Sequence, residues 1–187
     1  MTSGNSFYTE KELVDLGFRS IGRNVLISRK TSFYSTESIS IGDYSRIDDY
    51  CVLSGKIDIG SHVHISASTL LFSGDAGITI DDYSSVSSRC AIYAITDDYS
   101  GEYMVNPTVN DKNRNVIRKP VMIEKYVVIG TGSTVLPGVT IAEGCSVGAM
   151  TLVKESIEGW GIYAGIPCRR IKDRSRNLLK YIEKKDL

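Results

Sequence analysis

The chain has 187 residues, a length typical of one domain that buries its own core, so we expect residues 1–187 to form a single domain. Lysine plus arginine and aspartate plus glutamate both number 22, so the formal net charge is zero and no global basic field attracts nucleic acid or a membrane surface. Hydrophobic residues make up 42% of the chain, which excludes a fully disordered protein, and no apolar run approaches the ~18 residues that a membrane span needs.

The N-terminal residues predict a location and a first helix. Residues 1–7 carry neither a basic flank nor an apolar stretch, so we expect no secretory signal and a cytoplasmic protein. Residues 9–12, TEKE, match a capping box; a short apolar face follows, and Gly17 is a stop signal. The pattern predicts a helix over residues 9–17 that covers one open end of the fold.

Aliphatic residues recur every six positions over most of the chain. The two longest runs are Ile41, Ile47, Leu53, Ile59, Ile65, Leu71 and Ile123, Ile129, Val135, Ile141, Val147, Val153. Small or β-branched residues stand four positions after such aliphatics, and Cys51, Cys90 and Cys145 are among them. A period of six fits neither a helix nor a hairpin meander, but it fits a solenoid of short strands and corners. The register predicts that these three cysteines are reduced thiols in the core.

The six-residue frame divides the chain into parts. We predict first coils over residues 20–97 and last coils over 123–170, because the frame is lost after Ile92. Residues 98–122 leave the coils as a polar excursion loop, and loops of this length in compact domains are usually functional. Apolar residues on one face of the charged C-terminal segment predict a helix over 171–185 that covers the other end.

Over roughly residues 20–170 these repeats resemble those of the hexapeptide-repeat acyltransferases, in which an aliphatic residue, often followed by glycine, precedes a small residue by four positions. The resemblance implies an all-β fold, a left-handed parallel β-helix of about five or six coils. It also implies a homotrimer with active sites between subunits, and an enzyme that uses acyl-CoA, with acetyl-CoA favoured, as co-substrate without a permanently bound cofactor. With two histidines and four scattered cysteines, we expect no metal site.

The segment 163–172, YAGIPCRRIK, resembles the closing segment of that family, G-x-P-A-[KR]-x-I-[KR], with Cys168 where alanine is usual. In relatives this segment, which includes Pro167, lines the coenzyme A groove together with the preceding coils. The resemblance therefore implies cofactor contacts of two kinds. Main-chain groups of Gly130, Ala149 and Met150 would bind the pantetheine arm, and the cations Lys154, Arg169, Arg170 and Arg174 would face the phosphates.

The start of the loop departs from the family pattern. Galactoside and xenobiotic acetyltransferases of this family carry a histidine where the coil leaves for the loop, and Asp97 occupies that position here. An exposed aspartate is a poor general base for a hydroxyl, whereas a neutral amine mainly needs alignment, so the substitution favours N-acylation. Residues 97–102, DDYSGE, also resemble bacterial acyltransferases acting on nucleotide-linked 4-amino-4,6-dideoxyglucose. On that interpretation Asp97, Asp98 and Glu102 hold the sugar ammonium and take up a proton.

Other candidates lie in the coils. His64 precedes the interior Ile65 and is expected to meet the Asp97 region directly or across subunits, as a base or oxyanion donor; a purely structural role is the alternative. Further candidates for binding the substrate are Ser87, Ser88, Arg89 and, in the loop, Asn106.

Taken together, the residues and the resemblance predict an acyl-CoA-dependent sugar acyltransferase. N-acylation of a nucleotide-linked 4-amino-4,6-dideoxy sugar, for O-antigen or capsule biosynthesis, is favoured. The alternative is an O-acetyltransferase acting on a galactoside or polysaccharide, with His64 as the base.

Overall fold

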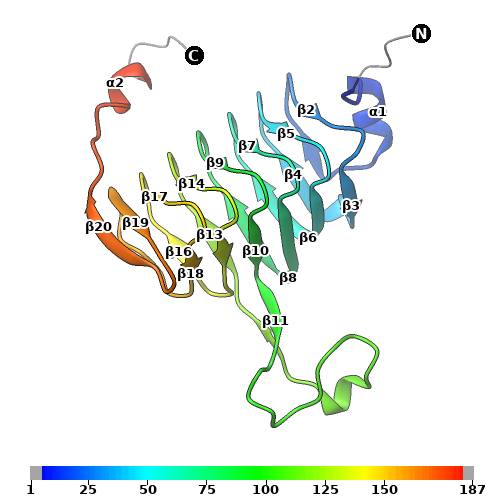
Figure 1. The fold of residues 1–187 in the computed structure, drawn as a ribbon. Helices are drawn as coiled ribbons and strands as arrows, with labels where there is room; N and C mark the ends of the chain where they lie inside the picture. Colours follow the sequence, from blue (N-terminus) through cyan, green and yellow to red (C-terminus); the bar gives the residue numbers. More distant parts are fainter. Residues whose placement is uncertain (1–5, 183–187) are drawn as a thin grey trace.

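The computed structural model describes residues 6–182, and there the chain winds into a parallel β-solenoid (Figure 1). Each turn passes through three faces, which we name A, B and C. Face A holds β3 (Ser32–Tyr34), the first halves of β6 (Val52–Ile59) and β8 (Leu70–Ile80), β10 (Ala91–Tyr93), β15 (Thr134–Val135) and β18 (Leu152–Val153). Face B holds β1 (Ser20–Ile21), β4 (Ile39–Ile41), the second halves of β6 and β8, β13 (Val121–Ile123) and β16 (Thr140–Ile141). Face C holds β2 (Leu26–Ile27), β5 (Arg46–Ile47), β7 (His64–Ile65), β9 (Ser85–Val86), β14 (Val128–Ile129), β17 (Ser146–Val147) and β19 (Gly161–Ala164).

The six-residue register accounts for the core. Each aliphatic residue of the two long runs is at most 4% exposed, and equivalent residues pair between coils, as Ile47 does with Ile65 and Leu53 with Leu71. Cys51, Cys90 and Cys145 are free thiols and at most 1% exposed. The predicted hexapeptide solenoid and the interior position of these cysteines are therefore confirmed.

The solenoid has more coils than the five or six expected. Face C alone carries seven parallel strands within the described residues. The last coil escaped the aliphatic count because its interior position is Tyr163, which is 6% exposed and packs in the same core. Its hydroxyl donates to the carbonyl of Glu158, so the polar end of the ring is satisfied.

Different elements cover the two ends of the solenoid, which lie far apart in Figure 1. The helix α1 (Glu10–Asp15) begins after the N-cap Thr9, whose capping box with Glu12 is complete, and Leu13 is 2% exposed in the core. The C-terminal prediction was wrong over most of its length. Strand β20 (Arg169–Asp173) pairs antiparallel with β19, and only α2 (Leu179–Ile182), without a buried residue, is helical; residues 183–185 lie outside the described part. The segment Arg169–Asp173 is charged and exposed, as a surface helix would be, but its hydrogen bonds to β19 hold it as a strand.

The excursion starts earlier than predicted, because β11 (Ile95–Asp97) pairs antiparallel with β12 (Val116–Arg118) to form a ribbon outside the coils. Residues 98–115 form the rest of this loop, including the 3-10 turn η2 (Asp111–Asn113), and it projects from the body in Figure 1. A second 3-10 turn, η1 (Thr36–Ser38), connects faces A and B in the first coils. None of the described helices is long and apolar enough to span a membrane.

Candidate active site

Asp97 ends β11 and ties the loop together. Its Oδ1 lies 3.2 Å from Nη2 of Arg114, and its Oδ2 accepts from the main-chain N–H of Asn106 at 3.0 Å. These contacts, the Asn106 hydrogen bond first, lower the pKa of Asp97. Asp97 is therefore a fixed negative charge and a weak base, which suits attraction of an ammonium better than removal of a proton from a hydroxyl.

The neighbouring loop residues also stabilise one loop conformation. Asp98 accepts from the main chain of Ser100 at 2.7 Å and from the Asn115 amide at 2.8 Å, and its pKa is lowered chiefly by Ser100. The amide oxygen of Asn106 accepts from the main chain and hydroxyl of Thr108. Glu102 is exposed on the loop.

A pocket of about 330 Å³ opens beside Asp97, between the ribbon and face A. Its apolar wall includes Phe72 and Tyr93, whose rings stack at 5.6 Å, together with Tyr99 of the loop. Asp97 and Arg114 supply its charged lining. The loop thus presents an aromatic surface next to a paired carboxylate.

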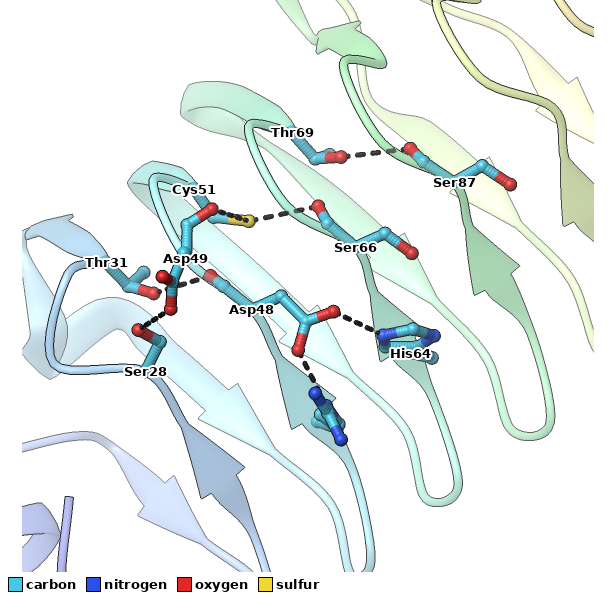
Figure 2. A network of polar contacts seen from close by, with 10 residues as sticks. Ser28, Thr31, Asp48, Asp49, Cys51, His64, Ser66, Thr69 and Ser87 are labelled. Carbon is cyan, nitrogen blue, oxygen red and sulfur yellow. Dashed lines mark hydrogen bonds and ion pairs between the residues drawn. The ribbon is translucent and has the colours of Figure 1, made fainter. Parts of the chain in front are cut away.

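His64 lies elsewhere, on the outer side of face C (Figure 2). Its Nε2 is 2.8 Å from Oδ2 of Asp48, whose Oδ1 accepts from Nε of Arg46 at 2.6 Å. Burial opposes ionisation of Asp48, but the hydrogen bonds from Arg46 and His64 outweigh it and lower the Asp48 pKa. The His64 side chain is 44% exposed, so a ligand can reach it.

Ser87 and Ser88 lie at the corner between faces C and A. Ser66 and Ser87 follow interior residues of adjacent coils at the same position as Asp48, and Figure 2 shows all three on one side of the ribbon. The hydroxyl of Ser88 lies 3.1 Å from that of Thr131. Arg89 is exposed at the tip of this corner, with a φ of 59°. The corner can offer hydroxyls and one cation to a ligand.

The three residues expected at the pantetheine arm lie along the same corner. The N–H of Gly130 donates to Val147 and that of Met150 to Thr131, so both stabilise coil stacking. Within residues 6–182, by contrast, no acceptor binds the N–H of Ser88, Thr131 or Ala149. At the corner between faces B and C, aspartate carboxylates accept from equivalent N–H groups, as Asp43 does from Arg23. The corner between faces C and A therefore keeps main-chain donors open for amide oxygens of a ligand.

Most of the predicted phosphate-binding cations come together at the end of this row. Lys154, Arg169, Arg170 and Pro167 line one pocket of about 170 Å³, beside Cys168. Arg174 is not among the cations of this pocket. Its Nη1 donates to the carbonyls of Tyr126, Gly144 and Cys145 at 2.6 to 3.1 Å, so its guanidinium stabilises the corner between faces B and C.

Two separate clusters result within one chain. The loop cluster contains Asp97, Asp98 and Glu102, and within residues 6–182 its strand β11 pairs only with β12. The face C cluster contains His64, on a strand of a different sheet, and Ser87, at the corner that follows β9 of that sheet. Figure 1 shows the loop projecting from the side opposite the labelled strands of face C. Direct contact between His64 and Asp97 within one subunit, one of the two arrangements expected, is not formed.

The chain resembles known proteins over nearly its whole length. Residues 113–155 match the family described as bacterial transferase hexapeptide (six repeats). The chain is 44% identical, over 94% of its length and 92% of the relative's, to a dTDP-4-amino-4,6-dideoxy-D-glucose acyltransferase from Escherichia coli. It belongs to the hexapeptide-repeat acyltransferases. The family and the acyltransferase activity expected from the repeats are thereby confirmed.

Solved structures support the same assignment for this hexapeptide-repeat acyltransferase. AntD, an N-acyltransferase from Bacillus cereus in complex with dTDP and 3-hydroxybutyryl-CoA, is 47% identical over 96% of both chains, with a TM-score of 0.94. A serine-to-cysteine mutant of AntD in complex with dTDP-4-amino-4,6-dideoxyglucose and coenzyme A superposes with a TM-score of 0.95. A maltose O-acetyltransferase from Clostridium difficile 630 shares the fold alone, at 19% identity and a TM-score of 0.60.

Sequence reasoning missed two residues of this hexapeptide-repeat acyltransferase. Arg114, with a side chain only 13% exposed, holds Asp97, and nothing in the sequence pairs residues 17 positions apart across a loop. Asp48 holds His64, and here a pattern was available. Asp48 and Ser66 each stand one position after an interior aliphatic, so Asp48 lies beside His64 on the next coil.

Proposed function

We propose that this enzyme transfers the acyl group of acyl-CoA to the amino group of a dTDP-linked 4-amino-4,6-dideoxy sugar. The amine nitrogen forms a bond to the thioester carbon, the bond from that carbon to sulfur breaks, and coenzyme A leaves as its thiol. Starting from the ammonium, one of its protons ends on the thiol and one is released. Two relatives support the proposal. The E. coli relative is a dTDP-4-amino-4,6-dideoxy-D-glucose acyltransferase, and a mutant of AntD forms a complex with dTDP-4-amino-4,6-dideoxyglucose and coenzyme A.

The observation that carries the proposal is the state of Asp97. The resemblance to galactoside and xenobiotic acetyltransferases implies a histidine at this position, whereas Asp97 stands here and both of its oxygens accept hydrogen bonds. A hydroxyl nucleophile would need a base there, whereas an amine needs a negative charge that aligns its ammonium. AntD mutants at an aspartate and at a serine ten positions before it form complexes with dTDP compounds and coenzyme A. Ser87 and Asp97 have this spacing, as do Ser88 and Asp98.

The site requires more than one copy of the chain. The loop cluster and the face C cluster do not meet within one subunit, and the loop carries exposed Tyr103, Met104 and Val105 at 46 to 57% exposure. We infer a homotrimer in which the loop of one subunit lies on the corner between faces C and A of its neighbour. Acyl-CoA would lie along that corner, with its phosphates at Lys154, Arg169 and Arg170. We infer a cytoplasmic reaction, because the proposed acceptor is nucleotide-linked, at a step that prepares a sugar for surface polysaccharide.

The test is the rate of thiol release from acetyl-CoA with matched acceptors. We expect turnover with dTDP-4-amino-4,6-dideoxyglucose and almost none with the nucleotide that carries a hydroxyl at carbon 4, or with a galactoside. Comparable rates with amine and hydroxyl acceptors would contradict N-acylation and favour the O-acetyltransferase alternative.

A pair of matched variants tests the role of the loop carboxylate. Asp97→Asn is expected to slow turnover without abolishing it, because the carboxylate aligns the amine and the main-chain donors remain. Asp111→Asn is the control, since Asp111 also contacts Arg114, at 3.1 Å, but its side chain is 94% exposed. Equal rates for the two variants would show that Asp97 has no role beyond shaping the loop.

A further inference from the structure

Asp48 and His64 form a carboxylate–imidazole pair on the outer side of face C (Figure 2). The Asp48 side chain is 20% exposed and that of His64 44%, so the carboxylate is the more enclosed partner. Arg46, paired with His64 in the strand register, occupies the other carboxylate oxygen. The pair is thus fixed from two sides, while the far edge of the imidazole faces outward.

The pair determines which nitrogen of His64 carries the proton. Hydrogen bonds from Arg46 and His64 keep Asp48 ionised, and a carboxylate only accepts hydrogen bonds. Nε2 of the neutral imidazole must therefore donate to Asp48, which leaves the lone pair on Nδ1. Asp97 offers no such group, because both of its oxygens accept hydrogen bonds inside the loop.

His64 is adjacent to the serines that the corner presents. It pairs with Ser85 on the next coil, and Ser66 and Ser87 lie two positions further along the same two coils, just past the strand ends. Coils stack at about 4.8 Å, so Nδ1 lies within about two coil spacings of the hydroxyl of Ser87. The groups packed around His64 are Arg46 and Asp48 on one side and Ser85 on the other; of these only Arg46 and Asp48 are charged.

We propose that Asp48 is a positioning residue for the acyl transfer, which holds His64 so that Nδ1 takes the proton of the acceptor ammonium. This rests on the proposed function. The ammonium gives one proton to Nδ1, and the amine forms its bond to the thioester carbon as the bond to sulfur breaks. The second proton of the nitrogen passes to the thiolate of coenzyme A, and the imidazolium returns its proton to solvent. Asp48 stabilises that imidazolium and remains ionised throughout.

Kinetics of Asp48→Asn, with Asp49→Asn as the matched control, test the proposal. Asp49 stands next in the chain, but its carboxylate binds Ser28 and Lys30 instead. For Asp48→Asn we expect kcat to fall at least about tenfold, and by no more than the ~10²–10⁴ that a positioned base contributes, with an unchanged KM for acyl-CoA. A fall in kcat at constant KM separates a role in the reacting step from a role in binding acyl-CoA. Asp49→Asn should keep the kcat and KM of the wild type.

A double-mutant cycle separates positioning from a general structural role. If Asp48 acts through His64, Asp48→Asn has no further effect on kcat in a His64→Ala background. Losses that multiply, or an Asp48→Asn enzyme with the wild-type kcat, would overturn the proposal. Melting temperatures of all variants establish that they fold.

Nitrogen-15 NMR of the imidazole rings reads the tautomer without any turnover. The chain has two histidines, so comparison with His64→Ala assigns both spectra. We expect the neutral His64 ring to be protonated at Nε2 in the wild type and in Asp49→Asn, but not fixed in this form in Asp48→Asn. Protonation at Nδ1 in the wild type would overturn the proposal even for a fully active enzyme. A wild type that releases no thiol with the amino-sugar nucleotide would instead refute the proposed function, and the proton-transfer step with it.

Discussion

Gly144 leaves the space that the ring of Trp160 occupies, and replacing it by alanine should be costly. A Cβ at Gly144 would lie 2.4 Å from Cδ2 of Trp160, far inside van der Waals contact. The ring has little freedom to retreat, because Tyr126 lies on one side at 6.4 Å between centroids and the Arg176 guanidinium lies 5.0 Å from the ring. Gly144 also has a φ of +69°, which disfavours any side chain.

Gly17 is the matched control. Its φ is +70°, but a Cβ there would meet no atom within 4 Å, so Gly17→Ala measures the backbone term alone. That term is about 1–2 kcal/mol for a residue in the left-handed region. Overpacking adds about 1–3 kcal/mol at Gly144. We therefore expect Gly144→Ala to lower the free energy of unfolding by about 2–5 kcal/mol and Gly17→Ala by the smaller amount.

Urea denaturation followed by circular dichroism, at one protein concentration, gives these free energies. A cycle with Trp160→Ala completes the test, because removing the ring should reduce the cost of Gly144→Ala to that of Gly17→Ala. Equal costs for the two glycine substitutions in the wild type would refute the argument. An unchanged cost of Gly144→Ala without the ring would do so too.

Three other predictions concern stability and thiol chemistry. Hydrogen bonds, chiefly from Arg29, lower the pKa of Glu12 from 4.5 to about 2, so its carboxylate stabilises the fold above pH 4.5. The melting temperature of the wild type should exceed that of Glu12→Gln there, and the difference should vanish as the pH falls to about 2. Iodoacetamide at pH 8 should modify the partly exposed Cys168 before Cys51, because burial raises the pKa of the Cys51 thiol to about 11. Bound acetyl-CoA should slow the modification of Cys168, because this residue lines the pocket proposed to hold the phosphates. Early modification of Cys51 in a peptide map would contradict this. Cys90→Phe should lower the free energy of unfolding by about 1–3 kcal/mol or more, measured against a smaller effect of Cys168→Phe, and equal effects would contradict the interior register.

Local pattern was sufficient for the repeated part of the fold. A side chain such as Leu53 meets the equivalent Leu71 of the next coil, so one periodic rule fixes strand, register and burial together. The phosphate-binding role of Lys154 and Arg169 was an expectation from the family resemblance, and the structure shows that both line one pocket. The six-residue rule did not extend to the C-terminal end of the solenoid. Residues of β20 have helical periodicity, but hydrogen bonds to β19 hold them as a strand.

The sequence by itself determined the solenoid, its interior register and the acyltransferase family, because each depends on contacts that repeat at a fixed spacing. Only the tertiary structure decided which chemical groups are available. In the folded chain, Arg174 donates to three main-chain carbonyls and His64 pairs with Asp48. One oxygen of Asp97 accepts from Asn106 and the other from Arg114. The contacts of Arg174 and Asp97 join residues up to 48 positions apart that no sequence period relates. The register does place Asp48 on the coil next to His64, but their hydrogen bond becomes visible only when the coils are stacked.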